Sequence, residues 1–383
     1  MSDNVHERLD RAAFVLDELA FRQNLTRVRG IADQAGVEII LALKAFSFWP
    51  AFGIAAEYLP SATASSLNEA KLVAEHFGVA PHVYCPAYVP HEFDELLELA
   101  GPVTFNSLSE IDRYRPKWEP IGTSVGLRVN PMYSPVETAL YNPASPTGRL
   151  GVAMDELPQM PPTGVAGVHV HALCESTAAA TATLIAEVEI GLKDWLPHLQ
   201  WLNLGGGHLM TKEGYETELL VRSLKGLRER HPHLKVILEP GSAHAWRSGY
   251  LVASVLDVIE NHGTKTAILD VSFTCHMPDT LEMPYTPTVR GAVVLDADAP
   301  ATERTYNLGG VSCLAGDYVG RYDFGEPLKA GSKIILEDML HYTTVKTSMF
   351  NGVQHPDLAI KRPDGRIDIV RRFDYADYKA RLG

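Results

Sequence analysis

Polar residues and glycines follow apolar, strand-like runs at several points in the first two-thirds of the sequence. The clearest case is LALKAF, in which the run 38–43, apolar except for Glu38, ends directly before Lys44. A buried, unpaired ammonium is costly, so such a lysine either reaches back to water or serves as a partly neutral, nucleophilic amine. The positions that resemble Lys44 in this respect are Asn106, Arg128, Asn130, His169, His171, Gly205–Gly207, His208 and Glu239.

These polar positions come together if the apolar runs are parallel strands of one barrel. The runs EIILAL, SATAS, HVYCP, PVTFNS, SVGLRVN, GVAGVHVHA, WLNLGGG and KVILEP alternate with helix-like segments. One predicted helix spans residues 17–36 with Asp17 as its N-cap, and another follows Ser65 and Ser66, with Glu69 near the capping-box position. Eight strand–helix repeats predict an α/β fold with a (β/α)8 barrel, whose strand ends converge on one mouth.

The pattern changes after about residue 245. Strand-like runs then follow one another at short spacing without long helices between them, which predicts an antiparallel β domain. The sequence therefore predicts an N-terminal strand in residues 1–20 that joins the β domain, a barrel in 21–250 and the β domain in 251–383. The Pro-rich stretch 130–151 predicts a long loop above the barrel, where loops commonly carry function.

Composition excludes several classes of protein. The chain has 383 residues, is 46% hydrophobic and carries a formal net charge of −13. Such an acidic balance argues against nucleic acid or an anionic membrane as a partner. The sequence contains no apolar run of about twenty residues and no signal-peptide core, so we expect no membrane span. Its four scattered cysteines form no zinc-like pair and indicate a reducing, cytoplasmic location.

Two further segments of the barrel half point to a cofactor. The glycines of LNLGGGH would let backbone N–H groups approach a phosphate, although tight turns use such triplets too. The strand VILEPG ends in Glu239, which is either a solvated turn residue or a carboxylate that keeps a pyridine nitrogen protonated and makes its ring an electron sink.

The segment GVHVHAL allows two interpretations. His169 and His171 alternate along a predicted strand, so both side chains should lie on the same face. With a third ligand they could bind zinc. The alternative, which the lysine and the glycine loop favour, is that one histidine stacks on a flat cofactor.

The predicted β domain contains its own reactive side chains. Cys313 and Asp317 share a glycine-punctuated loop, GGVSCLAGD, where the thiol is either inert packing or a proton donor. The loop SFTCHMPDTLEMPY holds His276, Asp279 and Glu282, whose acids would suit a substrate with several ammonium groups. Tyr342 should lie near a strand end, where its phenol could bind a phosphate.

Taken together, these segments resemble the fold-type III pyridoxal phosphate decarboxylases, the group of ornithine, arginine and diaminopimelate decarboxylases to which alanine racemase is related. Within that group the sequence is most similar to the carboxynorspermidine (carboxyspermidine) decarboxylase branch. The stretches that carry the resemblance are LALKAFSFW, HVHALCES, WLNLGGGH, LEPGSA, SFTCHMPDTLEMPY, SCLAGD and HYTTVKTSMFNG. They occur in the expected order along nearly the whole chain.

The resemblance implies an alanine racemase-like fold and a role for each matching residue. Lys44 would carry pyridoxal 5'-phosphate as a Schiff base, His171 would stack on its ring and Glu239 would pair with its ring nitrogen. Gly206, Gly207 and Tyr342 would hold its phosphate. Substrate contacts would come from Asp279, Asp317, Ser242, Arg149 and Glu175. Cys313 and Asp317 would reach in from the second subunit of a homodimer, with Cys313 as a candidate proton donor.

The resemblance also implies a reaction, namely decarboxylation of carboxynorspermidine, carboxyspermidine or both to norspermidine and spermidine in polyamine biosynthesis. Ser242 stands where ornithine and diaminopimelate decarboxylases have arginine and where the narrower branch often has glutamate. The segment Ala172–Glu175 replaces the Gly-Ser pair expected after the stacking histidine, a feature of the narrower branch. A diaminopimelate- or ornithine-type decarboxylase and a zinc-dependent barrel hydrolase are the alternatives.

Overall fold

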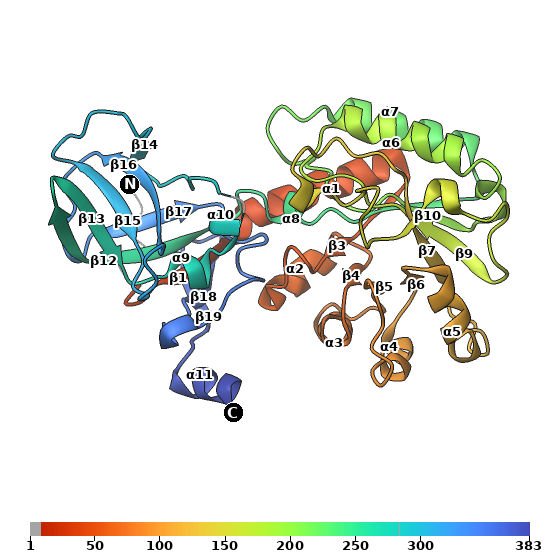
Figure 1. Ribbon diagram of the computed structural model, residues 1–383, viewed down its shortest axis with the longest axis horizontal. Coiled ribbons are helices and arrows are strands. Elements are labelled where there is room, and N and C mark those ends of the chain that lie inside the picture. The colour runs from red at the N-terminus through yellow and green to blue at the C-terminus, as the bar shows by residue number, and fades with distance from the viewer. Residues whose placement is uncertain (1–8, 283) are drawn as a thin grey trace. The chain divides into compact units, whose positions relative to one another are not determined.

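The described part of the chain folds as two compact units. The computed structural model describes residues 9–282 and 284–383. Gln23–His244 form one unit, here the barrel unit, and the described residues up to Arg22 join Ala245–Gly383 in the other, the β unit (Figure 1). The domain limits given above stay a prediction, because compactness alone does not show that each part folds independently.

The barrel unit contains the predicted ring of parallel strands. Its sheet has the order β2-β11-β10-β9-β7-β6-β5-β4-β3, and neighbouring strands are parallel. The strands are β2 (Glu38–Ile39), β3 (Leu41–Ala42), β4 (Ala62–Ala64), β5 (His82–Tyr84), β6 (Val103–Phe105), β7 (Val125–Asn130), β9 (Val165–His169), β10 (Trp201–Asn203) and β11 (Lys235–Leu238), with the short β8 (Val152–Ala153) beside β7. The predicted (β/α)8 barrel is therefore confirmed.

The first predicted strand differs in one respect, because it is divided into two. β2 pairs with β11, whereas β3 pairs with β4. At the division, the Ile40 N–H donates to the Leu238 carbonyl at 2.9 Å and the Leu41 N–H donates to the Ser61 carbonyl at 3.2 Å. The single run 38–42 thus lies between the last and the second strand of the ring and closes the barrel.

Helices lie outside the strands of this unit (Figure 1). They are α1 (Glu18–Ala35), α2 (Phe52–Ala56), α3 (Leu67–His76), α4 (Phe93–Leu99), α5 (Leu108–Trp118), α6 (Ala178–Gly191), α7 (Thr217–Arg230) and α8 (Ser242–Ala245), with 3-10 turns at Trp49–Ala51, Ala139–Tyr141, Met154–Glu156 and Leu196–His198. The predicted caps are confirmed: Asp17 accepts from the Ala20 N–H, and Ser66 accepts from the Glu69 N–H. Each cap satisfies an N–H that has no partner inside its helix.

The β unit is a mixed sheet rather than the antiparallel one predicted. Its order is β14-β16-β15-β13-β12-β1-β18-β19, with β17 also paired to β12. Most pairs are antiparallel, but β1 with β18 and β13 with β15 are parallel. The elements are β1 (Ala13–Asp17), β12 (Gly249–Asn261), β13 (Thr264–Leu269), β14 (Ala292–Val294), β15 (Thr305–Gly309), β16 (Tyr318–Phe324), β17 (Lys333–Glu337), β18 (Asp357–Lys361), β19 (Ile367–Arg371), α9 (Phe273–His276), α10 (Asp279–Glu282), α11 (Tyr375–Leu382) and a 3-10 turn at Phe350–Gly352.

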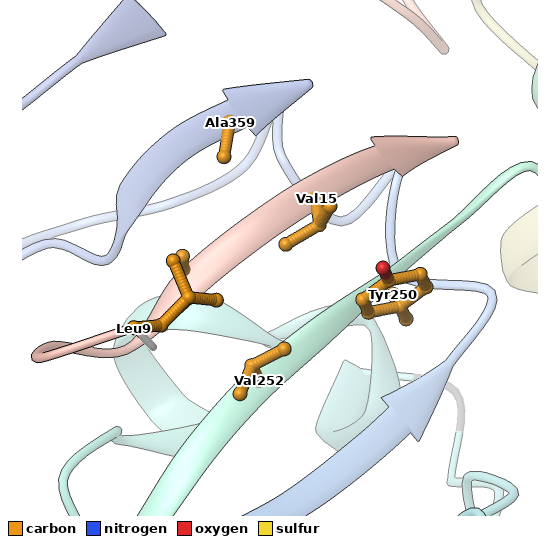
Figure 2. Packing of buried hydrophobic residues seen from close by; sticks show 6 residues of the cluster. Leu9, Val15, Tyr250, Val252 and Ala359 are labelled. Atoms are coloured by element: carbon orange, nitrogen blue, oxygen red, sulfur yellow. The ribbon is translucent and has the colours of Figure 1, made fainter. Parts of the chain in front are cut away.

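The early strand β1 lies in the middle of this sheet, between β12 and β18. Val15 of β1 is opposite Tyr250 on one side and Ala359 on the other. Figure 2 shows these side chains gathered with Leu9 and Val252 on one face of the three strands, where they form a buried cluster. This burial explains why residues far apart in the sequence form one sheet, since an apolar strand is stabilised only where both neighbours cover it.

Candidate active site

Lys44 lies in the turn that follows β3, at the carboxyl end of the strand, where the sequence placed it. Its side chain keeps access to solvent but is crowded by protein atoms. This crowding lowers the pKa of the Lys44 ammonium, the Arg128 guanidinium lowers it further, and Glu239, Cys174 and Glu69 partly oppose the shift. A lowered pKa leaves more of the amine neutral and nucleophilic at neutral pH.

A row of three polar side chains crosses the inside of the barrel below the mouth. Arg128 of β7, His169 of β9 and Asn203 of β10 are in register on adjacent parallel strands. Their side chains point to the same face, and their exposed fractions are only 4%, 4% and 3%. Burying polar side chains costs free energy unless they form hydrogen bonds or bind a ligand. We therefore expect the active site at this end of the barrel.

Glu239 follows the end of β11 and is held by this polar row. The Asn203 amide donates to Oε1 of Glu239 at 2.6 Å, and Nε2 of His169 lies 3.5 Å from Oε2. Burial raises the pKa of Glu239 to about 6, although Asn203, Lys44 and Arg128 favour the ionised form. The site therefore contains a carboxylate whose charge can be stabilised further by a cationic ligand.

The glycine loop is anchored to the segments that contain His171 and Glu239, and the Glu239 N–H donates to the Gly205 carbonyl at 2.7 Å. The Gly205 N–H donates to Oδ1 of Asn203 at 2.9 Å, and the Gly206 N–H donates to Nδ1 of His171 at 2.8 Å. His171 is thereby held as a neutral ring with its proton on Nε2, and burial together with Lys44 and Arg128 lowers its pKa well below the usual value. Within the described residues the Gly207 N–H has no acceptor, which leaves it available to an anion.

Close packing explains why the loop consists of glycines. A Cβ on Gly205 would lie 2.6 Å from His171, and Gly205 and Gly207 both have positive φ. A Cβ on Gly206 would lie 2.5 Å from the Glu239 carbonyl oxygen. The loop can therefore approach the glutamate, the histidine and a ligand only without side chains.

We expect Gly206→Ala to weaken binding of the pyridoxal phosphate that the sequence resemblance implies by roughly tenfold or more, because relief of the clash must move Glu239 or the loop by a fraction of an ångström. Gly53→Ala is the matched control, since Gly53 lies in α2 with nothing within 4 Å of its Cβ position. Fluorescence titration of both full-length variants with pyridoxal phosphate measures the difference. Equal affinities would contradict the tight packing of this loop.

The predicted loop after β7 is pinned at several points by side chains at strand ends. Asn106 donates to the Arg149 carbonyl and accepts from the Gly151 N–H, at 2.9 and 2.7 Å. Asn130 donates to the Ser145 carbonyl at 2.9 Å, and Arg128 donates to the Pro143 carbonyl at 3.3 Å. These bonds fix the backbone that presents the exposed Arg149 side chain, whose substrate role stays a prediction.

The other predicted site residues of the barrel unit lie in two short segments. Glu175 is exposed with a left-handed φ of 44°, in a loop whose Ser176 N–H donates to the Gly207 carbonyl. Ser242 is buried at the first position of α8, directly after Glu239-Pro240-Gly241. One expectation needs correction: β9 ends at His169, so His171 lies beyond the strand, although the two ring centroids are still 6.2 Å apart.

In the β unit, the Cys313 loop is organised by Asp317. One oxygen of this buried carboxylate accepts from the Thr274 N–H at 3.0 Å. The other accepts from the N–H and the hydroxyl of Ser312, at 3.1 and 2.6 Å. Cys313 is exposed, and its N–H donates to the Asn351 side chain at 2.9 Å. Asp317 thus has a local role in holding the loop, and its predicted substrate contact stays a prediction.

Asp279 and Tyr342 also belong to the β unit. Asp279 begins α10, and its Oδ2 accepts from the Tyr285 hydroxyl at 2.9 Å and the Thr343 hydroxyl at 3.3 Å. Its Oδ1 is buried without a hydrogen bond among the described residues. Tyr342 lies in a loop with a left-handed φ of 57°, five positions beyond the end of β17 rather than near a strand end.

The remaining expectations concern metal sites and membrane-spanning helices. Among residues 9–282 and 284–383, no group of three or more His, Cys, Asp or Glu side chains is arranged to hold a metal ion. In the same ranges, none of the helices combines the length and the apolar character that crossing a membrane requires.

Two residues of the site were not identified from the sequence. Asn203 connects Glu239 to the glycine loop, and Tyr84 packs edge-on against His169 while the Arg128 guanidinium lies 4.7 Å from the centre of its ring. A signal existed for Asn203, since it is the one polar residue of the apolar run before the glycines. Tyr84 carries no comparable signal, because a tyrosine in a strand is ordinary packing.

Known proteins are similar to this chain over nearly its whole length. Residues 13–339 match the family model described as pyridoxal-dependent decarboxylase, C-terminal sheet domain. A carboxyaminopropylagmatine decarboxylase from Synechocystis is 47% identical over 98% of this chain and 96% of its own length. A carboxynorspermidine/carboxyspermidine decarboxylase from Campylobacter jejuni is 37% identical over 98% of this chain and 99% of its own.

Solved structures agree with these matches. The crystal structure of carboxynorspermidine decarboxylase complexed with norspermidine from Campylobacter jejuni has a TM-score of 0.91 and 36% identity, covering 97% of this chain and 100% of that one. A diaminopimelate decarboxylase from Helicobacter pylori, at 17% identity and a TM-score of 0.80 over 99% of this chain and 98% of its own, shows that the fold extends to more distant proteins.

Proposed function

The chain belongs to the pyridoxal-dependent decarboxylases, and from this membership we propose that it acts on carboxynorspermidine, carboxyspermidine or both, in polyamine biosynthesis. The observation that carries the proposal is the union of Lys44, His171 and Glu239 at one barrel mouth with near full-length similarity to relatives of that specificity. The reaction is the removal of carbon dioxide, so the enzyme is a carboxy-lyase.

The residues present fit pyridoxal phosphate on structural grounds. The barrel mouth offers an amine of lowered pKa, a neutral imidazole ring, a backbone N–H with no acceptor in the described ranges and a largely buried carboxylate of raised pKa. When bound, pyridoxal phosphate supplies a cationic conjugated ring that takes up the electron pair left by the departing carboxylate. Lys44 would hold its carbonyl carbon, Glu239 its ring nitrogen and Gly207 its phosphate.

The chain's own side chains then have distinct tasks. Glu239 keeps a proton on the ring nitrogen, because an ionised carboxylate favours the cation beside it. His171 offers the flat face of a neutral ring, which its bond from Gly206 holds in place. Lys44 would supply the amine that holds the carbonyl carbon of the cofactor while no substrate is bound. Cys313 of the second subunit is the proposed proton donor to the α-carbon, since its thiol is exposed and its N–H donates to the Asn351 side chain.

Asp279 is the proposed partner for a substrate amine. Its Oδ2 is engaged by two hydroxyls, whereas its buried Oδ1 lacks a hydrogen bond within the described ranges. A buried carboxylate oxygen without a partner is costly, and an ammonium group would remove that cost. Asp317, Ser242, Arg149 and Glu175 remain proposed substrate contacts, and Tyr342 remains a proposed phosphate contact.

A second substrate deserves equal testing because the Synechocystis relative is the more similar sequence. Carboxyaminopropylagmatine shares the amino-acid head of the other two compounds but ends in a guanidinium group instead of an ammonium. A comparison of the three compounds as substrates therefore tests which distal group the pocket accepts. Tails that differ by a methylene are separated by only about 1–3 kcal/mol, so rates must be compared quantitatively.

The test is a steady-state assay of the purified, cofactor-loaded chain with each compound. We expect carbon dioxide release and the matching polyamine by mass spectrometry, with the highest kcat/KM for a carboxynorspermidine or carboxyspermidine substrate. A clear preference for carboxyaminopropylagmatine would transfer the assignment to that substrate. Turnover of diaminopimelate or ornithine alone would overturn the polyamine assignment.

We also propose a cytoplasmic homodimer with active sites at the subunit interface. All four cysteines are free thiols, as in reducing compartments, and the net charge of −13 disfavours nucleic acid and anionic membranes as partners. Beside Cys313, the side chains of Val311, Leu314 and Phe350 are 41%, 46% and 47% exposed. A second copy that covers this apolar surface would stabilise it.

The dimer predicts a mass of about twice 42.0 kDa in light scattering after size exclusion. Leu314→Glu should shift the protein toward the monomer and lower its activity, because a charge would be buried in the proposed interface. Ile190→Glu is the control, since Ile190 is 71% exposed in α6 of the barrel unit. An active protein that stays monomeric at all concentrations would refute the dimer.

A further inference from the structure

His169 is a buried histidine for which the proposed reaction has no assigned use. It is the last residue of β9, its exposed fraction is 4%, and neither ring nitrogen makes a hydrogen bond within the described ranges. Burying an unsatisfied polar group costs about 1–3 kcal/mol, which an apolar side chain at this position would avoid. Because a histidine is present here despite this cost, we expect His169 to have a function in the site.

Among the described residues, Glu239 is the carboxylate that lies near a ring nitrogen of His169. Nε2 of His169 lies 3.5 Å from Oε2 of Glu239, slightly longer than a hydrogen bond. Tyr84 packs edge-on against the imidazole with ring centroids 5.3 Å apart, which fixes the ring plane. Catalytic contacts of this length in ligand-free sites commonly shorten on loading.

The carboxylate of Glu239 is fixed from its other side. Asn203 donates to Oε1 at 2.6 Å and is itself held by the Gly205 N–H at 2.9 Å. Oε1 therefore cannot turn toward His169 without breaking this chain of bonds. The charged and titratable groups that face the His169–Glu239 pair are Lys44 after β3, Tyr84 of β5, Arg128 of β7, His171 after β9 and, more distantly, His82 of β5.

These neighbours determine the protonation state of His169. Burial and the positive charges of Arg128 and Lys44 lower its pKa well below the usual value, so the ring is neutral at neutral pH. A neutral imidazole carries one N–H, and the carboxylate beside Nε2 favours the tautomer with the proton there. His169 is then a donor to Glu239 that adds no charge to the barrel.

We propose that His169 is a positioning residue, which donates its Nε2–H to Oε2 of Glu239 and keeps this carboxylate ionised for the ring nitrogen of the cofactor. Asn203 and His169 thus hold one oxygen each. Without the second donor, the buried carboxylate would retain a proton to higher pH and lose its hold on the cofactor. The inference rests on the proposed function for the role that an ionised Glu239 would have. The hydrogen bond from His169 to Glu239 itself can be tested without cofactor or substrate.

The first test measures the titration of Glu239 in the full-length chain without added cofactor. The carbonyl infrared band of the protonated carboxyl is identified by its loss in Glu239→Gln. We expect His169→Leu to raise the titration midpoint by about one pH unit, equivalent to about tenfold in proton affinity. His169→Gln retains an N–H donor and should shift it by less than half as much. An unchanged midpoint in His169→Leu would overturn the proposal.

The second test measures binding of pyridoxal phosphate at pH 7 by fluorescence. His169→Leu should bind roughly tenfold more weakly, and His169→Gln should recover most of the loss. His276→Leu is the control, because His276 is another buried histidine of lowered pKa but lies in α9 of the β unit. An equal loss in His276→Leu, or no recovery in His169→Gln, would indicate a merely structural role and overturn the proposal.

The two tests separate this inference from the proposed function. Wild-type protein that fails to bind pyridoxal phosphate would refute the function, while the infrared titration would still decide the His169–Glu239 contact. Wild-type protein that binds the cofactor but shows no effect of His169→Leu on either measurement would refute the inference and leave the function intact.

Discussion

Lys44→Ala is expected to lower turnover by roughly a thousandfold or more and to abolish covalent attachment of the cofactor. The amine at this position is the only described lysine placed beside Glu239, Arg128 and Cys174 at the barrel mouth. Alanine removes the nucleophile and one positive charge without filling the space. The residual activity would reflect binding of cofactor and substrate by the remaining groups.

The measurement combines spectroscopy with peptide mapping. Wild-type protein should show an absorption band near the visible edge of the ultraviolet that disappears on borohydride treatment, with the added mass on the peptide containing Lys44. Lys71→Ala is the matched control, because Lys71 is a surface lysine of α3 paired with Glu95 at 2.7 Å. Retention of both the band and turnover in Lys44→Ala would remove the basis of the assignment.

Glu239→Gln is expected to cost roughly a hundredfold in turnover while leaving the fold as stable as before or more stable. Glutamine is nearly isosteric and can still accept from Asn203, but it cannot balance a protonated ring nitrogen. The pKa of Glu239 is raised to about 6 in the fold, so the folded chain binds a proton more tightly than the unfolded chain does. Ionisation of Glu239 therefore destabilises the fold, by up to about 2 kcal/mol above pH 6.

The pH dependence separates the effect of Glu239 on the stability of the fold from its effect on cofactor binding. Wild-type stability should fall as pH rises from about 4.5 to about 6, the interval between the ordinary and the raised pKa, and this component should be absent in Glu239→Gln. Binding of pyridoxal phosphate to the wild type should weaken as pH falls below about 6, where Glu239 takes up a proton. Denaturant melts and cofactor titrations over this range test both. A Glu239→Gln enzyme of normal activity would contradict the assigned role.

Much of the barrel was predictable because its signals are local. Lys44 and Glu239 directly follow apolar runs, and parallel strands end at one mouth, so their convergence required only the strand–helix rhythm. The caps at Asp17 and Ser66 were likewise readable from neighbouring residues. The division of the run 38–43 was not, since it depends on which strands lie on either side of it.

The β unit was harder to predict because its strand pairing depends on which segments of the chain come to lie side by side. Its parallel pairs, β1 with β18 and β13 with β15, join segments that are distant in sequence or separated by another strand. Composition also cannot show that Asp317 is engaged by Thr274 and Ser312, because an acid near a cysteine reads equally well as a substrate contact. The bond from Asn203 to Glu239 was missed because strand register alone brings those two strand ends together.

The divided first strand has a consequence for the order of events during synthesis. β3 can pair with β4 as soon as residue 64 is made, but β2 must wait for β11, which ends at Leu238. The ring is therefore sealed by a contact between segments almost two hundred residues apart, and such long-range closure is slow. Lys44 lies five positions beyond β2 and faces the glutamate that follows β11. A nascent chain that has not yet left the ribosome past residue 239 consequently has the lysine but no completed pocket, so cofactor capture comes after closure of the barrel.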